Sequence, residues 1–169
     1  MMQPRALITG ITGMVGSHLA DYLVAETDWN VIGMCRWRSP LENLGDLVPM
    51  INQGERVSIL YGDLRDTLAV QDVVRQAKPD YVFHLAAQSY PRTSFESPLD
   101  TFDNNIQGTV RVLDALRQYS PNAVVHVCAS SEVFGRVPKE KIPIGEETGF
   151  HPASPYAISK VGTDLIGRY

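Results

Sequence analysis

The chain has 169 residues, of which 44% are apolar and 20% charged, and its formal net charge is −4. This length and composition are typical of about one globular domain, and the acidic balance argues against general binding to the phosphate backbone of nucleic acids. No apolar run approaches the ~20 residues that a membrane-spanning helix needs, and the residues before Ala6 lack the anatomy of a signal peptide.

Short apolar runs alternate with segments of helical periodicity along the chain. The predicted strands are Ala6–Thr9, Val31–Cys35, Val57–Tyr61, Tyr81–Leu85 and Ala123–Cys128. Several are apolar on consecutive residues, which is typical of strands covered on both faces. Strands that alternate with helices predict an α/β fold over residues 1–169, a doubly wound parallel sheet of the Rossmann type.

Apolar side chains at helical spacing predict the faces of three amphipathic helices. The first face consists of Val15, Leu19, Tyr22 and Leu23, the second of Val70, Val73, Val74 and Ala77, and the third of Ile106, Val110 and Leu113. The segment Ser130–Pro152, rich in Gly and Pro, is the one long irregular stretch, and long loops of this kind are often functional.

A glycine-rich turn, Thr9–Gly16, follows the first predicted strand and opens the first helix. Gly10 would allow a tight turn, Gly13 a close approach of a pyrophosphate, and Gly16 close packing of the helix on the strand. Because the N–H groups of a helix N-terminus bind phosphates, the predicted dinucleotide contacts here are Gly10, Thr12, Gly13, Met14, Val15 and Gly16. The alternative is a glycine-rich turn without a ligand.

The end of the second predicted strand indicates which dinucleotide binds. An NAD enzyme would place an acidic residue there to bind the ribose 2′-hydroxyl, but the sequence continues with Arg36, Trp37 and Arg38. Arg36 would hold a 2′-phosphate by charge-assisted hydrogen bonds, which favours NADP. The alternative is that Arg36 and Arg38 are solvated surface charges.

Two further segments lie at carboxyl ends of predicted strands, where such folds bind ligands. Asp63 and Leu64 would contact the adenine, although Asp63 would equally serve as a helix cap near Asp66. The small side chains that end the fourth strand would let the cofactor lie against the backbone, and they could equally serve close packing. The predicted contacts there are Leu85, Ala86, Ala87 and Ser89.

Four residues near the end of the chain have the chemistry of a catalytic site. Tyr156 and Lys160, which are also predicted cofactor contacts, are four residues apart on one helix face, and the ammonium group, with the oxidised nicotinamide ring, would favour the phenolate. Tyr156 could then accept a hydroxyl proton as hydride leaves the adjacent carbon. Ser130 and Glu132 end the fifth strand; they would donate a hydrogen bond and supply a carboxylate, or serve as a turn residue and a surface charge. Ser154 is the predicted N-cap of the helix.

No metal site is predicted, because Cys35 and Cys128 are distant and no His/Cys spacing suits a metal. The two cysteines are expected to be reduced thiols of a cytoplasmic protein. His84 and His126 lie inside strand patterns and are interpreted as core residues.

Together these motifs resemble the extended short-chain dehydrogenase/reductase superfamily, and within it the GDP-mannose 4,6-dehydratase family. The segments that carry the resemblance are Thr9–Gly16, Tyr61–Leu64, His84–Ser89, Asn105–Thr109, Ser130–Gly135 and Ser154–Lys160. The family usually has Gln-Asp where this chain has Met14 and Val15. Because extended relatives run to about twice this length, the resemblance implies an N-terminal half without the last strands and the C-terminal substrate domain. Such a half would leave a sheet edge and apolar helix faces uncovered.

The resemblance implies an NADP-dependent lyase that converts GDP-mannose to GDP-4-keto-6-deoxymannose. Tyr156, Lys160 and Ser130 would serve oxidation at C4, and Glu132 would remove the C5 proton and assist loss of the 6-hydroxyl, before hydride returns to C6. It also implies a homodimer or homotetramer, with no nucleic acid or membrane partner. The alternatives are another epimerase, decarboxylase or 4-keto reductase of the superfamily, or a nucleotide-binding regulatory module without turnover.

Overall fold

Five parallel strands form one sheet in the order β3-β2-β1-β4-β5. The computed structural model describes residues 3–169, so residues 1–2 of the predicted domain lie outside the described residues. The strands are β1 (Arg5–Thr9), β2 (Asn30–Cys35), β3 (Val57–Tyr61), β4 (Tyr81–His84) and β5 (Val124–Val127). Their order is that of the first five strands of the 3-2-1-4-5-6 doubly wound sheet, which confirms the predicted α/β fold.

Helices connect the strands and cover the sheet. They are α1 (Met14–Glu26), α2 (Val48–Gln53), α3 (Thr67–Ala77), α4 (Pro91–Glu96), α5 (Pro98–Phe102), α6 (Gly108–Tyr119) and α7 (Pro155–Arg168). A π-helical turn at Asp103–Gln107 leads into α6, and 3₁₀ turns occupy Glu42–Leu47, Ser131–Phe134 and Lys139–Lys141. The short helices α2, α4 and α5 were not predicted, because five or six residues are too few to show an apolar period.

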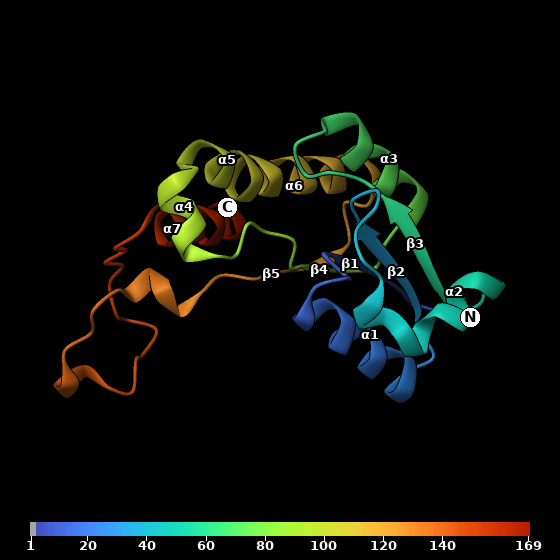
Figure 1. Ribbon diagram of the computed structural model, residues 1–169, viewed down its shortest axis with the longest axis horizontal. Coiled ribbons are helices and arrows are strands. Elements are labelled where there is room, and N and C mark those ends of the chain that lie inside the picture. The colour runs from blue at the N-terminus through green and yellow to red at the C-terminus, as the bar shows by residue number, and fades with distance from the viewer. Residues whose placement is uncertain (1–2) are drawn as a thin grey trace.

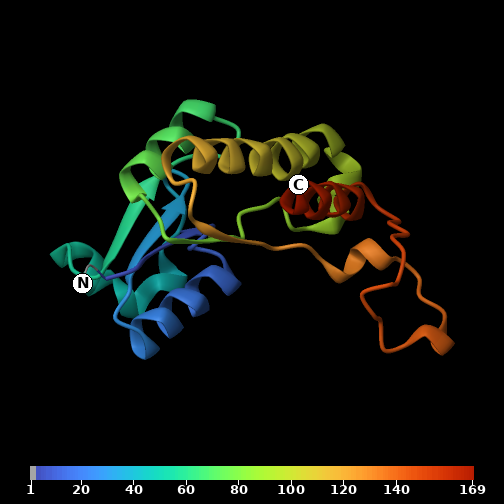
Figure 2. The same cartoon turned by 180° about the vertical axis from the view of Figure 1, so that it is seen from behind.

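The helices lie in two layers, with α1 on one face of the sheet and α3 and α6 on the other (Figure 1). The view from behind shows the same layers, with α7 beside α6 (Figure 2). In both views the segment between β5 and α7 extends away from the body of the molecule. The irregular stretch predicted over 130–152 therefore forms an arm with two 3₁₀ turns.

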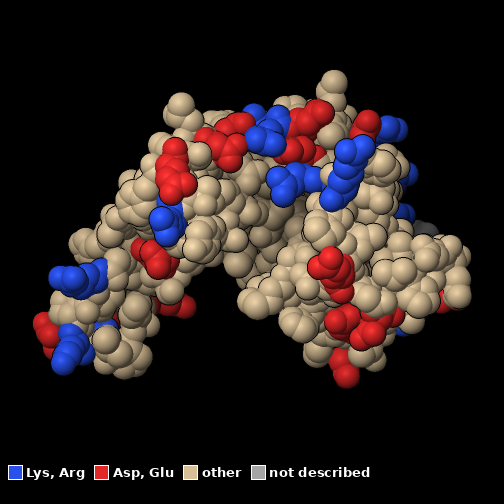
Figure 3. All heavy atoms as spheres, viewed as in Figure 1, with Lys and Arg blue, Asp and Glu red and all other residues tan. Residues whose placement is uncertain are grey.

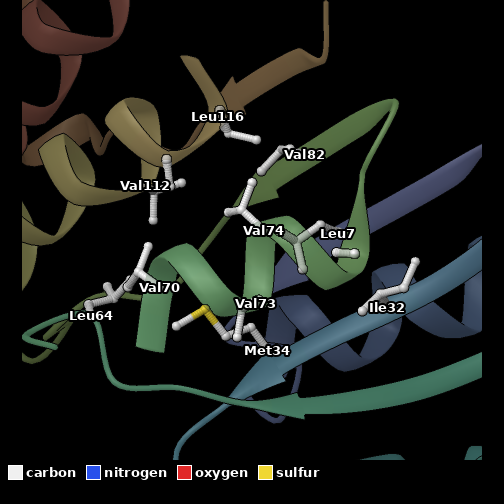
Figure 4. Packing of buried hydrophobic residues seen from close by; sticks show 12 residues of the cluster. Leu7, Ile32, Met34, Leu64, Val70, Val73, Val74, Val82, Val112 and Leu116 are labelled. Carbon is white, nitrogen blue, oxygen red and sulfur yellow. The ribbon is translucent and has the colours of Figure 1, made fainter. Parts of the chain in front are cut away.

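Alternate residues of the central strand β1 pack into two hydrophobic clusters, one on each face of the sheet. Leu7 packs with α3 and α6, whereas Ala6 and Ile8 pack with α1 and the segment before β3, as expected from the strand period of two. Figure 4 shows Val70 and Val74 of α3 among the first set of side chains, between the sheet and α6. The predicted face of α3 is confirmed, since all four of its residues are buried.

The predicted face of α1 is wrong at two positions. Val15 and Tyr22 are 55% and 61% exposed. The buried residues are instead Gly16, Ser17, Ala20 and Leu23. Small residues face the sheet because the helix packs closely on it: a Cβ on Gly16 would overlap the Gly10 carbonyl and lie 2.8 Å from the Ile11 Cα.

The predicted face of α6 is wrong at Val110, whereas Leu113 packs against the core as expected. Val110 is 40% exposed, and Ile106 and Leu113 are only partly buried. The face that packs on the sheet and α3 contains Thr109, Val112 and Leu116. Val110 is thus an exposed apolar residue of α6, and Ile158 and Leu165 are half-exposed apolar residues of the neighbouring α7.

The edge strand β5 departs from the prediction that its histidine is a core residue. Val124 and His126 are exposed on this strand, which pairs only with β4 in the described sheet. His84 on β4 is buried as predicted. Over residues 3–169, no helix combines the length and apolar character needed to cross a membrane.

Candidate active site

A cavity of about 380 Å³ opens where the strands end at their carboxyl edge. It is lined by ten of the residues predicted to bind the cofactor: Gly10, Thr12, Gly13, Arg36, Asp63, Leu64, Leu85, Ala86, Ala87 and Ser89. Figure 3 shows the hollowed centre of the molecule, largely free of charged groups, with acidic and basic side chains interleaved above it. The cavity thus joins four strand ends that are distant in sequence.

The glycine turn forms the floor of this cavity. Gly10 has a φ of +75°, and a Cβ there would lie 2.9 Å from the Ala86 Cα, so glycine is required both by the backbone and by the close approach of β4. Gly13 is the N-cap of α1 and makes no side-chain cap bond, and the first turn contains no acidic residue. The N–H groups of that turn therefore remain available to an anion.

Three predicted contacts on α1 lie outside the cavity lining. Met14 and Val15 have exposed side chains, so only their backbone N–H groups would serve a phosphate. Gly16 is buried and serves the packing of α1 on the glycine turn.

An acid–base cluster follows β3 on the rim of the cavity. Arg65 forms hydrogen bonds to both Asp63 carboxylate oxygens at 3.1 and 3.0 Å and pairs with Asp100 at 2.8 Å. These side-chain hydrogen bonds from Arg65 hold the pKa of the Asp63 carboxyl below its usual range. Asp63 is not the helix cap, because the Asp66 side chain accepts the N–H groups at the start of α3.

Sequence reasoning missed Arg65, Asp100, Gln88 and Asn104 in the cavity lining. Gln88 follows the small residues after β4, and its Oε1 is buried without a hydrogen-bond partner in the described structure. In the sequence, the only sign that Gln88 would line the cavity was its position directly after Ala87. Arg65 and Asp100 are 35 residues apart, and no pattern in the sequence indicated their pairing.

A buried polar chain lies under the cavity. His84 Nδ1 lies 2.8 Å from the Thr9 hydroxyl, and His84 Nε2 lies 3.0 Å from the Thr109 hydroxyl. The Thr109 hydroxyl donates its one proton to the Asn105 carbonyl at 2.6 Å. Nε2 must therefore be the donor to Thr109, and Nδ1 accepts from Thr9, which in turn accepts the Ala86 N–H at 3.2 Å. The geometry assigns a neutral imidazole with its proton on Nε2.

Asn105 in the π-helical turn continues this chain to α7. Its amide accepts from the Gln88 N–H at 2.7 Å and donates to the Gln88 carbonyl at 3.0 Å. It also donates to the Ser159 hydroxyl at 2.8 Å, and Ser159 donates to the Tyr156 carbonyl at 2.7 Å. The end of β4 and the first turn of α7 are thus fixed relative to one another.

The predicted catalytic helix begins as its sequence indicates. The Ser154 hydroxyl accepts the Ala157 N–H at 3.0 Å, which confirms it as the N-cap. Tyr156 and Lys160 are both buried, at 8% and 5% exposure. Lys160 Nζ donates to the Cys128 carbonyl at 2.8 Å, and burial lowers the pKa of the ammonium below its usual range.

Ser130 and Glu132 lie two and four residues beyond Cys128. Ser130 is the N-cap of the 3₁₀ turn that contacts α7, and Glu132 lies inside that turn. The Ser130 hydroxyl accepts the Glu132 N–H at 3.2 Å, which leaves the hydroxyl proton free to donate. The Glu132 side chain is exposed. These two residues, with Tyr156 and Lys160, lie outside the lining of the 380 Å³ cavity.

The residues of the cavity fit a dinucleotide. The glycine turn removes the side chains that would block a pyrophosphate, the N-terminus of α1 has no competing acid, and the buried Gln88 Oε1 has no partner. No cluster of three or more His, Cys, Asp or Glu side chains suited to a metal occurs in residues 3–169.

Comparisons with known proteins agree with this architecture. The chain is 37% identical over 167 residues to GDP-mannose 4,6-dehydratase from Vibrio cholerae, which covers 95% of this chain and 44% of that protein. In structure it is similar to the dTDP-glucose 4,6-dehydratase of Streptomyces venezuelae, solved with NAD bound (TM-score 0.81, 29% identity, 97% of this chain and 50% of that one).

A similar match is a UDP-N-acetylglucosamine 4-epimerase from Methanobrevibacter ruminantium (TM-score 0.81, 29% identity, 99% of this chain and 50% of that one). The chain spans less than half the length of the Vibrio cholerae dehydratase described above. The sequence model of the family described as GDP-mannose 4,6 dehydratase matches residues 7–169. The resemblance drawn from the motifs is confirmed: the chain belongs to the GDP-mannose 4,6 dehydratase family.

Proposed function

We propose that the protein is an NADP-dependent nucleotide-sugar 4,6-dehydratase that acts on GDP-mannose, and that this chain supplies its cofactor site and its acid–base residues. The observation that carries the proposal is the arrangement at the carboxyl edge of the sheet. The cavity with the glycine turn lies at one part of this edge. Lys160, anchored on the Cys128 carbonyl, fixes Tyr156 and its helix at the end of β5.

Bound NADP⁺ would accept hydride from C4 of the sugar and later return it to C6. Tyr156 removes the proton of the 4-hydroxyl. Lys160 favours the phenolate by its positive charge, and the hydrogen bond that it donates to the Cys128 carbonyl keeps the ammonium in place. Ser130 donates its free hydroxyl proton to the sugar oxygen, since the oxygen of that hydroxyl is held by the Glu132 N–H.

Glu132 carries the elimination step. Once C4 is a ketone, the proton on C5 becomes acidic, and the Glu132 carboxylate removes it. The electrons of the C–H bond form the C5–C6 double bond as the 6-hydroxyl leaves, and the same carboxyl group returns a proton to the departing oxygen, so that water is lost. The exposed position of Glu132 next to Ser130 supports access to a bound sugar.

Arg36 supports the choice of NADP over NAD. Its side chain lines the cavity, is exposed, and forms no ion pair with any acid in residues 3–169. A free guanidinium at the end of β2 suits a 2′-phosphate, where an NAD enzyme would carry a carboxylate.

The partner proposed for the protein is a second copy of itself. The outward apolar side chains of Val110, Ile158 and Leu165 on α6 and α7 support a homodimer or homotetramer.

The test is turnover of GDP-mannose in deuterated water by the whole protein that carries this chain. We expect a 4-keto-6-deoxy product that has lost one water and carries deuterium at C5. Glu132→Gln should lower elimination by about 10²–10⁴-fold, whereas Glu140→Gln, in the same arm and also exposed, should leave it unchanged.

Three outcomes would contradict the proposal. Turnover of a UDP- or dTDP-sugar without any product from GDP-mannose would refute the substrate. Inversion at C4 without loss of water, unaffected by Glu132→Gln, would indicate an epimerase. Nucleotide binding without any turnover would indicate a regulatory module.

A further inference from the structure

An exposed aromatic pair stands beside the cofactor cavity, where β2 and β3 end. Trp37 is 69% exposed and Tyr61 is 49% exposed. Their ring centroids are 4.9 Å apart and their planes make an angle of 84°. This edge-to-face contact holds the indole in place and leaves most of its surface open.

The backbone positions this pair by a strained turn. The Ser39 N–H donates to the Arg36 carbonyl at 3.0 Å, which closes a turn directly after β2. Arg38 has a φ of +67°, in the left-handed region that residues with a Cβ rarely adopt. Residues in such conformations occur often at ligand sites.

A second pocket of about 470 Å³ lies against the pair and adjoins the first cavity. Trp37 and Tyr61 line the second pocket, and the two spaces share the lining residues Arg36, Ser39, Gly62 and Asp63. The charged residues that line this second pocket differ in whether they form ion pairs. Asp63 is already held by Arg65, while Arg36 and Arg38 pair with no acid in the described chain.

We propose that Trp37, supported by Tyr61, stacks on the adenine of the cofactor, and that Arg36 and Arg38 hold the phosphate on its ribose. This rests on the proposed function, because it takes NADP as the ligand. An open indole face next to two unpaired guanidinium groups has the chemistry of a site for a flat base that carries phosphate. The Trp37–Tyr61 pair makes the adenine end a determinant of affinity as well as the glycine turn.

The test uses 2′,5′-ADP as the probe, with calorimetry and tryptophan fluorescence as readouts. We expect binding of 2′,5′-ADP to quench the emission of Trp37, and 5′-AMP to bind more weakly because it lacks the 2′-phosphate. Trp37→Ala should weaken the affinity for 2′,5′-ADP by about 5- to 150-fold, the range of a lost base–aromatic stack. Trp37→Phe should keep most of the affinity.

Trp29 provides the matched control. It lies just before β2, whereas Trp37 lies just after it, and it is stacked on Tyr81 with centroids 4.3 Å apart. Trp29→Phe should therefore leave both the quenching and the affinity unchanged, and Trp37→Phe should abolish the quenching.

The inference is overturned if 2′,5′-ADP does not bind, if the quenching survives Trp37→Phe, or if Trp37→Ala binds 2′,5′-ADP as tightly as the parent protein. Failure of the two proposals is distinguishable. A dehydratase product from GDP-mannose together with unchanged affinity in Trp37→Ala refutes only the stacking. Weakened affinity in Trp37→Ala without any such product refutes only the dehydratase.

Discussion

Protonation of His84 should destabilise the folded protein in mildly acidic solution. The imidazole is enclosed, and burial, with the nearby charge of Lys160 as the second cause, lowers the pKa of His84 to about 4. Its two ring nitrogens are already used, Nε2 as donor to Thr109 and Nδ1 as acceptor from Thr9. A second proton on Nδ1 would face the hydroxyl that donates to it.

The magnitude follows from proton linkage. An unfolded chain titrates this histidine near pH 6.5, so below that pH the unfolded state binds the additional proton and the folded state does not. The stability that neutral His84 contributes is fully present above pH 6.5 and is lost as the pH falls towards 4. A difference of about 2.5 pH units at 1.36 kcal/mol each corresponds to about 3 kcal/mol, a large part of the 5–15 kcal/mol typical of a domain.

Urea unfolding followed by circular dichroism at several pH values between 7 and 4 measures the effect. His84→Gln removes the titrating group, so its free energy of unfolding should fall less steeply with acid than that of the parent protein. His126→Gln removes an exposed histidine on β5 and should keep the parent slope. Parallel curves for the parent and His84→Gln would refute the reasoning, as would nitrogen NMR shifts that place the proton on Nδ1.

Two further substitutions test the cofactor site and the glycine turn. Arg36→Ala should weaken binding of NADP by about 10- to 100-fold, as expected for lost charge-assisted hydrogen bonds, and leave NAD unchanged; calorimetry with both nucleotides decides, and equal losses would contradict the assignment. Gly16→Ala should lower the free energy of unfolding by about 1–3 kcal/mol, because its Cβ would overlap the Gly10 carbonyl. Gly45→Ala, where a Cβ meets nothing within 4 Å, should change it by less than about 0.5 kcal/mol in urea unfolding.

Strands β1 and β2 could be predicted because their buried residues follow one another directly in the sequence. Four of the five residues of β1 and five of the six of β2 are buried, so apolar runs without alternation marked them. The two edge strands are less buried, with one buried residue in β3 and none in β5, since exposure at a sheet edge depends on which neighbours the strand has. No local pattern could show that His126 and Val124 would face outward.

The cavity lining was largely predictable for a topological reason. Parallel strands end at one edge, so residues after β1, β2, β3 and β4 must meet there, and ten predicted residues do line one cavity. What the sequence could not show is which side chains pair with one another. The Asp63–Arg65–Asp100 cluster and the unpartnered Gln88 Oε1 depend on loop geometry.

The wrong placement of Val110 on the predicted face of α6 has a physical explanation that connects the fold to the site. The residues that pack inward are Asn105, Thr109, Val112 and Leu116, which follow helical spacing but change from polar to apolar along the element. The polar pair lies near the carboxyl edge of the sheet, where Thr109 bonds to His84 and Asn105 to Gln88 and Ser159. The apolar pair packs in the core with α3.

A count of apolar residues therefore selects the adjacent face of α6, one residue further along the helix, which is more apolar and less buried. The same change from apolar to polar occurs in the strands that adjoin it, from Leu7 to Thr9 in β1 and from Val82 to His84 in β4. Buried polar groups of this kind are tolerated only when each finds a partner. The polar end of the core thus forms a hydrogen-bonded support that joins the glycine turn, through His84 and Asn105, to the helix that carries Tyr156 and Lys160.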